Sequence, residues 1–173
     1  MKKILHKDYF SRPATELAPD LIGKILCRRT ENGIIRARIT ETECYFGEED
    51  TACHAHKGKT PRTSVMYEAG GVSYVYLCYG MHAMLNLVTG EENHPEAVLI
   101  RGLDVAKGPG RTTVFMKITT ADNDLPLTEE GGIWIEDDGS APPEYTALPR
   151  VGIDYASDED RNRKWRFVIK ERE

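Results

Sequence analysis

Two glutamates, Glu41 and Glu43, stand two residues apart in a segment that follows an Asn-Gly turn and is typical of a β-strand. Because side chains alternate between the faces of a strand, Ala37, Ile39, Glu41, Glu43 and Tyr45 are predicted to share one face. Carboxylates at i and i+2 lie about 6.5–7 Å apart, which suits the acid and base of an inverting glycosidase. The alternative is that both acids face solvent because the strand has left the core.

Large apolar side chains are predicted at the tip of a second hairpin. Tyr79 and Met81 flank Gly80 between two apolar runs. Proteins that kink or open a duplex push apolar or aromatic side chains between base steps from such tips. The alternative is that this tip packs under the long polar loop that precedes the hairpin. The pattern therefore indicates either a DNA wedge or a covered turn.

Tyrosines on two predicted strands suggest a slot for a flat ring. Tyr45 ends the strand that carries the glutamates, and Tyr76 lies within another apolar strand. If the two strands are neighbours, the rings can stack on both sides of a base, which contributes ~1–3 kcal/mol per base. An aromatic core cluster accounts for the same residues.

A single cation interrupts another apolar strand. Arg101 lies within the sequence VLIRGL, where a guanidinium needs a carboxylate or phosphate partner. That partner is either a catalytic glutamate or a structural ion pair. Cys53, His54 and His56 also allow a zinc site, but zinc sites normally show two well-spaced ligand pairs. We therefore expect no metal and no other cofactor.

The charge of the chain is unevenly distributed. The net charge is −5, but residues 120–160 hold twelve acids and only one base, Arg150. The remaining residues carry 16 acids against 22 bases, and residues 54–62 carry three full positive charges and no acid. A protein that is anionic overall can still present a cationic face to phosphates. A solvated loop gives the same pattern, so charge alone does not establish DNA binding.

The surrounding elements are those of an α+β protein. A chain of 173 residues suits one domain. We expect a single compact domain on a curved, mostly antiparallel β-sheet with short helices and a protruding β-hairpin. The predicted elements are a helix over 14–22 kinked at Pro19, strands over 24–30, 34–46 and 97–103, two strands within 72–88, an irregular loop over 47–71, and short strands or helices at 114–118, 132–136 and 165–170.

Composition also bounds the cellular setting. No apolar run reaches the ~20 residues of a membrane span, and no basic-then-apolar leader precedes the chain. The four cysteines lack any CxxC spacing, so packed, reduced thiols are expected. We expect a cytoplasmic protein, associated with the bacterial nucleoid if it binds DNA, and no membrane partner.

Taken in order, several blocks of this chain resemble one family. They are FSRP near the N-terminus, ETECY followed by ED and CH, then TPR, YVYLCYGMH, VLIR and GPGR. Together they resemble the alkyladenine (methylpurine, 3-methyladenine) DNA glycosylases of the mixed α/β type. The resemblance runs from about Phe10 to Gly152, and it implies that residues 1–173 form one DNA glycosylase domain that contains the acidic segment.

The resemblance implies a role for each matching residue. Glu43 matches the general base that activates water, and Arg101 matches the arginine that helps to hold that water. The base pocket would comprise Tyr45 and Tyr76, which stack on the extruded base, His54, which contacts its edge, and Asn86, which helps to exclude the guanine amino group. Tyr79 would fill the gap left in the duplex, with Met81 beside it, and we expect Lys57, Lys59, Arg62 and Arg111 to contact the DNA backbone.

The implied activity is that of a monofunctional enzyme of base excision repair. It would act as a monomer on double-stranded DNA that contains damaged purines, and would release the base to leave an abasic site without a lyase step. The chain departs from many relatives in its short connection over residues 103–107 and in His56 and Thr63. Two alternatives remain: a glycoside hydrolase that uses Glu41 and Glu43 as a pair, and a non-catalytic binder of damaged or single-stranded DNA.

Overall fold

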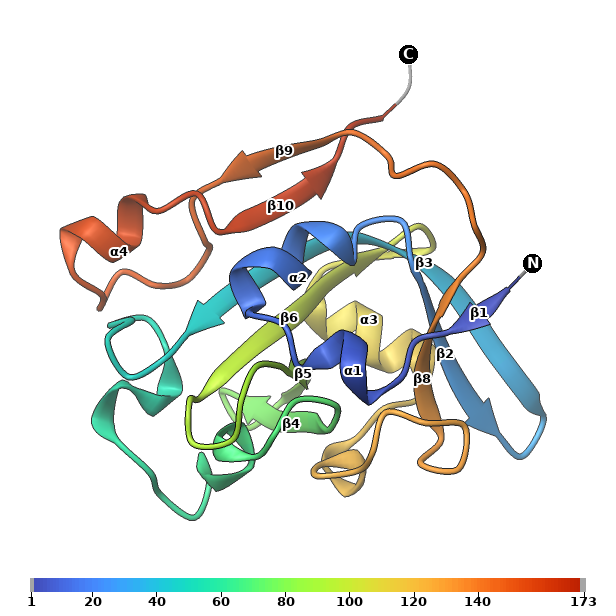
Figure 1. Cartoon of the computed structure of the whole chain (residues 1–173), viewed down its shortest axis with the longest axis horizontal. Coiled ribbons are helices and arrows are strands. Elements are labelled where there is room, and N and C mark those ends of the chain that lie inside the picture. Colours follow the sequence, from blue (N-terminus) through green and yellow to red (C-terminus); the bar gives the residue numbers. More distant parts are fainter. Residues whose placement is uncertain (1, 172–173) are drawn as a thin grey trace.

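The computed structural model describes residues 2–171, which form ten strands and several short helices (Figure 1). The strands are β1 (Lys3–Ile4), β2 (Ile25–Thr30), β3 (Gly33–Phe46), β4 (Ser73–Cys78), β5 (His82–Val88), β6 (Glu96–Leu103), β7 (Ala106–Lys107), β8 (Ile133–Asp137), β9 (Tyr145–Leu148) and β10 (Arg166–Ile169). The α-helices are α1 (Lys7–Phe10), α2 (Ala14–Asp20), α3 (Pro109–Met116) and α4 (Asp158–Asn162), and the 3₁₀ helices are η1 (His54–Lys57), η2 (Ser64–Tyr67) and η3 (Thr120–Asp122).

The strands form one antiparallel sheet with a branch. Its main order is β1-β8-β2-β3-β6-β5-β4, while β10 pairs with β3 and β9, and β7 pairs with β6. Figure 1 shows β9 and β10 along the edge of the molecule next to β3, away from β1, β2 and β8. The predicted α+β class with a mostly antiparallel sheet is confirmed.

The central strand β3 changes partners along its length. Its first half forms a hairpin with β2, and residues 41–43 pair with β10. Its pairing with β6 is irregular on both sides of Glu41. Ile39 and Cys44 consequently both lie in the main core, although residues five apart in a regular strand face opposite ways.

This irregularity corrects the predicted face of β3. Ala37 and Ile39 point into the core, whereas Glu43 and Tyr45 line a pocket instead of continuing that face. Thr42 takes the core side, where its hydroxyl donates to the Ala18 carbonyl of α2 at 2.6 Å. Simple alternation failed because the register shifts change the phase of the strand between residues 39 and 42.

The other predicted elements need smaller corrections. Helix α2 continues through Pro19 and ends one residue later, so the expected extension to residue 22 was wrong. The short segments of unassigned type are resolved as α3 for 114–118 and as β8 and β10 for 132–136 and 165–170. The irregular stretch 47–71 contains only η1 and η2 as regular elements. Helix α2 packs on β3 and β6, and α3 packs on β5 and β6.

The acidic segment lies against the hairpin of β2 and β3. Four ion pairs connect them: Asp122–Arg28 at 2.9 Å, Glu136–Arg36 at 3.1 Å, Asp137–Lys24 at 3.1 Å and Asp138–Arg38 at 2.7 Å. Burial alone would raise the pKa of Glu136, but hydrogen bonds from Arg36 and Trp134 outweigh it and leave that pKa below its usual value. Much of the negative charge of the acidic segment is therefore paired with basic residues of the same protein.

Two remaining expectations concern thiols and membranes. The four cysteines are free, and all but the half-buried Cys78 are buried, as expected for packed thiols. Within residues 2–171, the helices are too short or too polar to cross a bilayer.

Candidate active site

A pocket of about 400 Å³ opens between β3, β6, the β4–β5 hairpin and residues 151–155. Six residues assigned to catalysis and base recognition from the sequence line it together: Glu43, Tyr45, His54, Tyr76, Asn86 and Arg101. They come from four strands and the 3₁₀ helix η1, so the fold brings together groups that are up to 58 positions apart in the chain. Their individual roles stay predictions.

The Glu43 carboxylate is held on several sides. Its side chain has no exposed surface. One oxygen accepts the backbone N–H of Val151 at 2.7 Å, and the other accepts the Tyr45 hydroxyl at 3.0 Å. The Arg101 guanidinium lies 3.6 Å from the second oxygen. Burial raises the pKa of Glu43, and these three neighbours reduce that rise without cancelling it.

The two glutamates differ in their surroundings. The Arg101 Nε donates to Glu41 at 2.7 Å, so Glu41 holds the guanidinium beside Glu43. The Glu41 side chain is 23 % exposed, whereas that of Glu43 is fully buried. Arg101 thus has a carboxylate partner on each side. Glu41 therefore holds Arg101 in place, whereas Glu43 is the carboxylate that faces the pocket.

Aromatic side chains form the walls of the pocket. The His54 and Tyr76 rings meet edge to face with centroids 4.5 Å apart, and Tyr74 lies 5.4 Å from Tyr76. His54 Nδ1 lies 3.3 Å from the Tyr74 hydroxyl. Burial lowers the pKa of His54 and the nearby Arg62 lowers it further, so the imidazole is neutral near pH 7. Asn86 donates its side-chain amide to the Tyr74 carbonyl at 3.3 Å, which fixes its orientation.

A buried ion pair supports the pocket from behind. Arg150 forms two hydrogen bonds with Asp50, at 2.6 and 2.9 Å, and both side chains are almost fully buried. The Arg150 guanidinium also lies 5.0 Å from the ring centre of Tyr45. Asp50 accepts further hydrogen bonds from the backbone N–H groups of Phe46 and Ala52. The ion pair therefore holds Arg150, the residue before Val151, against the end of β3.

The hairpin tip at the rim of the pocket is bare. Tyr79 is 93 % exposed and Met81 is 74 % exposed. Tyr79 and Gly80 both have positive φ values, 52° and 65°, which produce a tight turn that projects the two flanking side chains. The alternative in which this tip packs under the preceding loop is wrong.

Basic side chains expected at the DNA backbone are exposed. Lys57, Lys59, Arg62 and Arg111 all lie at the surface. The Arg62 guanidinium lies 5.1 Å from the ring centre of Tyr76, and the Lys59 ammonium 5.6 Å from that of Tyr67. Within residues 2–171, the ion pairs closer than 4 Å involve other bases, so these four charges face solvent without an acidic partner.

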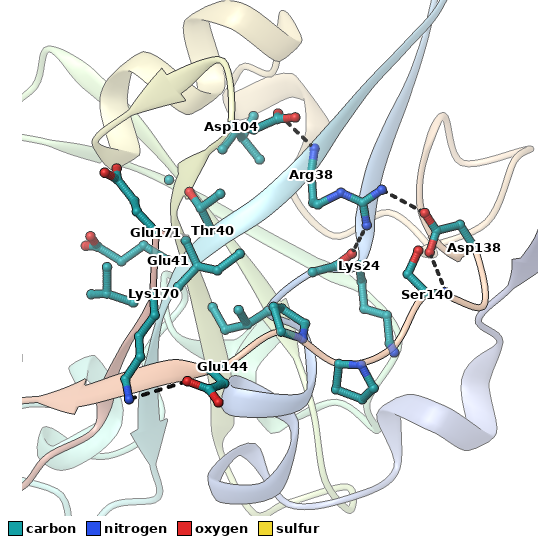
Figure 2. A pocket seen from close by; sticks show the side chains of 18 of the residues that line it. Lys24, Arg38, Thr40, Glu41, Asp104, Asp138, Ser140, Glu144, Lys170 and Glu171 are labelled. Atoms are coloured by element: carbon teal, nitrogen blue, oxygen red, sulfur yellow. Dashed lines mark hydrogen bonds and ion pairs between the residues drawn. The ribbon is translucent and has the colours of Figure 1, made fainter. Parts of the chain in front are cut away.

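A second, larger pocket of about 1130 Å³ lies where β3 passes from β2 to β10 (Figure 2). Glu41 lines this pocket while its partner Arg101 lines the smaller one, so their hydrogen bond separates the two. Figure 2 shows that charged side chains in the larger pocket pair with each other, as Arg38 does with Asp138. Among the residues that the structure describes, no aromatic ring lines it, so these residues offer a flat base nothing on which to stack.

Zinc ligands do not gather around the histidines. Within residues 2–171, no three His, Cys, Asp or Glu side chains are arranged to hold a metal ion. His56 is exposed, with Nδ1 2.6 Å from the Glu48 carbonyl, and Cys53 is buried in the aromatic cluster. The zinc alternative therefore has no structural support in this part of the chain.

The chain is similar to proteins of one known family. The family model described as methylpurine-DNA glycosylase matches residues 8–107 and 103–173. The chain belongs to this family. Similar proteins bear the name "Putative 3-methyladenine DNA glycosylase". The one from Psychrobacter cryohalolentis is 44 % identical over 91 % of this chain and 88 % of the relative, and that from Methanocella arvoryzae is 42 % identical over 96 % and 92 %.

In this methylpurine-DNA glycosylase, one wall of the pocket was not predicted from the sequence. Val151 and Tyr155 line it, and Arg150 and Asp50 hold that wall in place. A signal for it was available, because Arg150 is the only base among residues 120–160 and is followed by an apolar residue and a glycine. Residues of the short connection 103–107, by contrast, line the larger pocket and are absent from the lining of the smaller one.

The Asp50–Arg150 pair gives a prediction about stability. Asp50→Asn leaves the buried Arg150 charge without its counterion, so we expect the free energy of unfolding to fall by about 3–5 kcal/mol. Urea unfolding of the two purified proteins measures the difference. The matched control is Glu49→Gln, because the Glu49 side chain is 63 % exposed and makes only a 3.4 Å contact with His94. Equal stability of Asp50→Asn and wild type would contradict the structural role of the pair.

Proposed function

We propose that this protein is a monofunctional DNA N-glycosylase of base excision repair that extrudes alkylated purines of the 3-methyladenine type and hydrolyses their N-glycosidic bond. The observation that carries the proposal is the fully buried Glu43 carboxylate in an aromatic pocket with an exposed wedge at its rim. The names of the similar proteins support the choice of substrate class. The product would be an abasic site in an otherwise intact strand.

Access to the lesion requires base flipping. The pocket is a cavity in the protein, so a base within a duplex must leave the stack to enter it. Tyr79 and Met81 project from the rim, where one or both would occupy the space that the base vacates. Damaged bases cost the least to unstack, which already favours lesions over normal bases. Lys57, Lys59, Arg62 and Arg111 would hold the phosphates on either side.

Recognition of the extruded base would depend on stacking. Tyr45 and Tyr76 supply two ring faces, and a cationic N-alkylpurine is attracted to such electron-rich faces. The neutral His54 would contact the edge of the base. Asn86 is fixed by its bond to Tyr74, so its amide would not yield to the extra amino group of guanine. The buried aromatic surface and these two fixed groups would select shape and charge together.

The chemical step needs one activated water molecule. Glu43 would accept a proton from water while the water oxygen forms a bond to C1′ and the C1′–N bond breaks. The electron pair of that bond leaves with the base, and a cationic N-alkylpurine becomes neutral as it departs. Arg101, held by Glu41, would orient the water, and the Glu43 charge would stabilise the cationic sugar of the transition state.

Two substitutions test this assignment. We expect Glu43→Gln to abolish base release, because the amide cannot accept the proton from water, and Glu41→Gln to retain part of the activity, because Arg101 loses only its support. The assay incubates a duplex containing 3-methyladenine with each protein and measures free base and alkali-labile sites. Thermal unfolding confirms that both variants are folded.

Other outcomes of this assay identify the alternatives. Equal losses from Glu41→Gln and Glu43→Gln would favour a glycoside hydrolase with paired carboxylates. Binding of the lesion duplex by wild type without any free base would favour a non-catalytic binder. Strand cleavage without alkali would implicate lyase chemistry by a lysine such as Lys57 or Lys59, and would contradict the monofunctional assignment.

The pH dependence of the rate follows from the state of Glu43. The general base must be ionised, and the pKa of Glu43 is raised above its usual 4.5 by burial. We therefore expect the single-turnover rate on a 7-methylguanine duplex to fall with decreasing pH, with its half-maximal point above pH 4.5. Circular dichroism at each pH separates this effect from unfolding. A rate that is constant down to pH 4.5 would contradict Glu43 as the base.

The pocket also predicts a preference among lesions. Cationic bases leave readily and stack well on tyrosine, whereas neutral lesions such as hypoxanthine need protonation on leaving. Among residues 2–171, Glu43 is the one carboxyl group in the pocket lining, so no second acid is there to supply the proton. We expect faster single-turnover release of 3-methyladenine than of hypoxanthine, after correction for the spontaneous loss of each base. Comparable corrected rates on the two duplexes would refute this preference.

A further inference from the structure

Tyr155 is an aromatic residue of the pocket to which the proposed function assigns no role. Tyr155 lines the pocket, and its side chain is 67 % exposed. Its hydroxyl nevertheless donates to the Ala52 carbonyl at 2.7 Å. Large exposed rings on a protein surface are usually free to change rotamer, whereas this ring is anchored at its far end. Tyr155 therefore presents a fixed apolar surface at the mouth of the pocket.

The backbone that carries Tyr155 is also fixed. Val151 donates its N–H to Glu43, and Ile153 and Ala156 pack with Ala52 in a small buried cluster that contacts Tyr45. Burial raises the pKa of Tyr155 and outweighs the opposing Arg150 charge, so the phenol stays protonated as a donor at neutral pH. Tyr155 thus lines the same pocket as Glu43 from the segment whose Val151 bonds Glu43, whereas Tyr79 belongs to the hairpin of β4 and β5.

The position of this ring relative to Glu43 suggests what it contacts. This step depends on the proposed function, in which the base lies inside the pocket and C1′ lies next to the water held by Glu43. The deoxyribose is then the part of the nucleotide at the mouth. Because the Tyr155 hydroxyl is occupied by Ala52, the ring itself is the group available to the sugar. Glycosidic cleavage makes that sugar cationic, and ring faces attract cations.

We infer that Tyr155 is a further catalytic residue that packs its ring against the deoxyribose of the extruded nucleotide and stabilises the positive charge developing there. Its hydroxyl serves as the anchor to Ala52, and the chemistry depends on the ring. A leucine at this position would fill space without an electron-rich face, whereas a phenylalanine would keep the face and lose only the anchor.

The test compares two sugar mimics in otherwise identical duplexes. One carries a pyrrolidine in place of the deoxyribose, which is cationic at neutral pH, and the other carries a neutral tetrahydrofuran. We expect wild type to prefer the pyrrolidine, and Tyr155→Leu to reduce that preference by a factor of about 3 to 30, the range of a cation–π contact. Tyr155→Phe should keep most of the preference.

Single-turnover base release provides the second measurement. Tyr155→Leu should lower the rate by a similar factor with little change in the affinity for the tetrahydrofuran duplex. The matched control is Tyr145→Leu, because Tyr145 is also partly exposed but packs edge to face on Phe167 away from the pocket. That variant should behave as wild type, and thermal unfolding of all variants reports any loss of folding.

Several results would overturn the inference. An unchanged preference for pyrrolidine in Tyr155→Leu would show that the ring does not sense the sugar charge. Equal weakening toward both mimics would show that the ring only holds DNA. These failures are distinct from failure of the proposed function, which would appear as wild-type protein that releases no base. If wild type releases base and Tyr155→Leu matches it in both assays, only the role of Tyr155 is refuted.

Discussion

The burial of a single carboxylate sets the terms for the rest of the site. An ionised carboxylate in an apolar interior is costly unless hydrogen bonds and charge replace its water. Glu43 receives that replacement from three directions: a backbone N–H, a phenol and a guanidinium. Two of these donors have a support of their own: Asp50 holds Arg150 next to Val151, and Glu41 holds Arg101. The network offsets part of the cost of burial and leaves the Glu43 carboxylate poorly solvated, with a raised pKa, which suits the proposed general base.

The irregular pairing of β3 and β6 makes this burial geometrically possible. The core sides of the two strands carry Ile39 and Cys44 on β3 and Ile100 and Leu103 on β6. Each pair spans a change of phase that a regular strand would not allow. Arg101 and Glu41 sit within the irregular stretch and reach each other there. The distortion thus gives a central sheet position to two charged groups without placing them in the core.

Sequence reasoning predicted this site through its local patterns and failed where distant contacts decide. The hairpin tip at Gly80, the aromatic strands and the cation in VLIRGL were visible because each breaks a local rule of polarity. The phase of β3 was mispredicted, because register shifts depend on the partner strand β6. The wall formed by Val151 and Tyr155 was missed, because Arg150 and Asp50 are a hundred positions apart in the chain and come together only in the folded structure. Local sequence patterns identified the candidate residues, whereas tertiary contacts determine how those residues are oriented.

The pairing of the acidic segment with the β2–β3 hairpin has a consequence for how the protein searches DNA. Four ion pairs within the protein neutralise basic side chains that would otherwise attract phosphates far from the pocket. The molecule keeps a net charge of −5. Much of its surface would thus be repelled by a duplex, while the exposed Lys57, Lys59 and Arg62 would attract its phosphates. We expect this asymmetry of charge to orient encounters with DNA and to keep them short on intact duplexes. The face that carries the pocket would then be the one presented to the nucleobases.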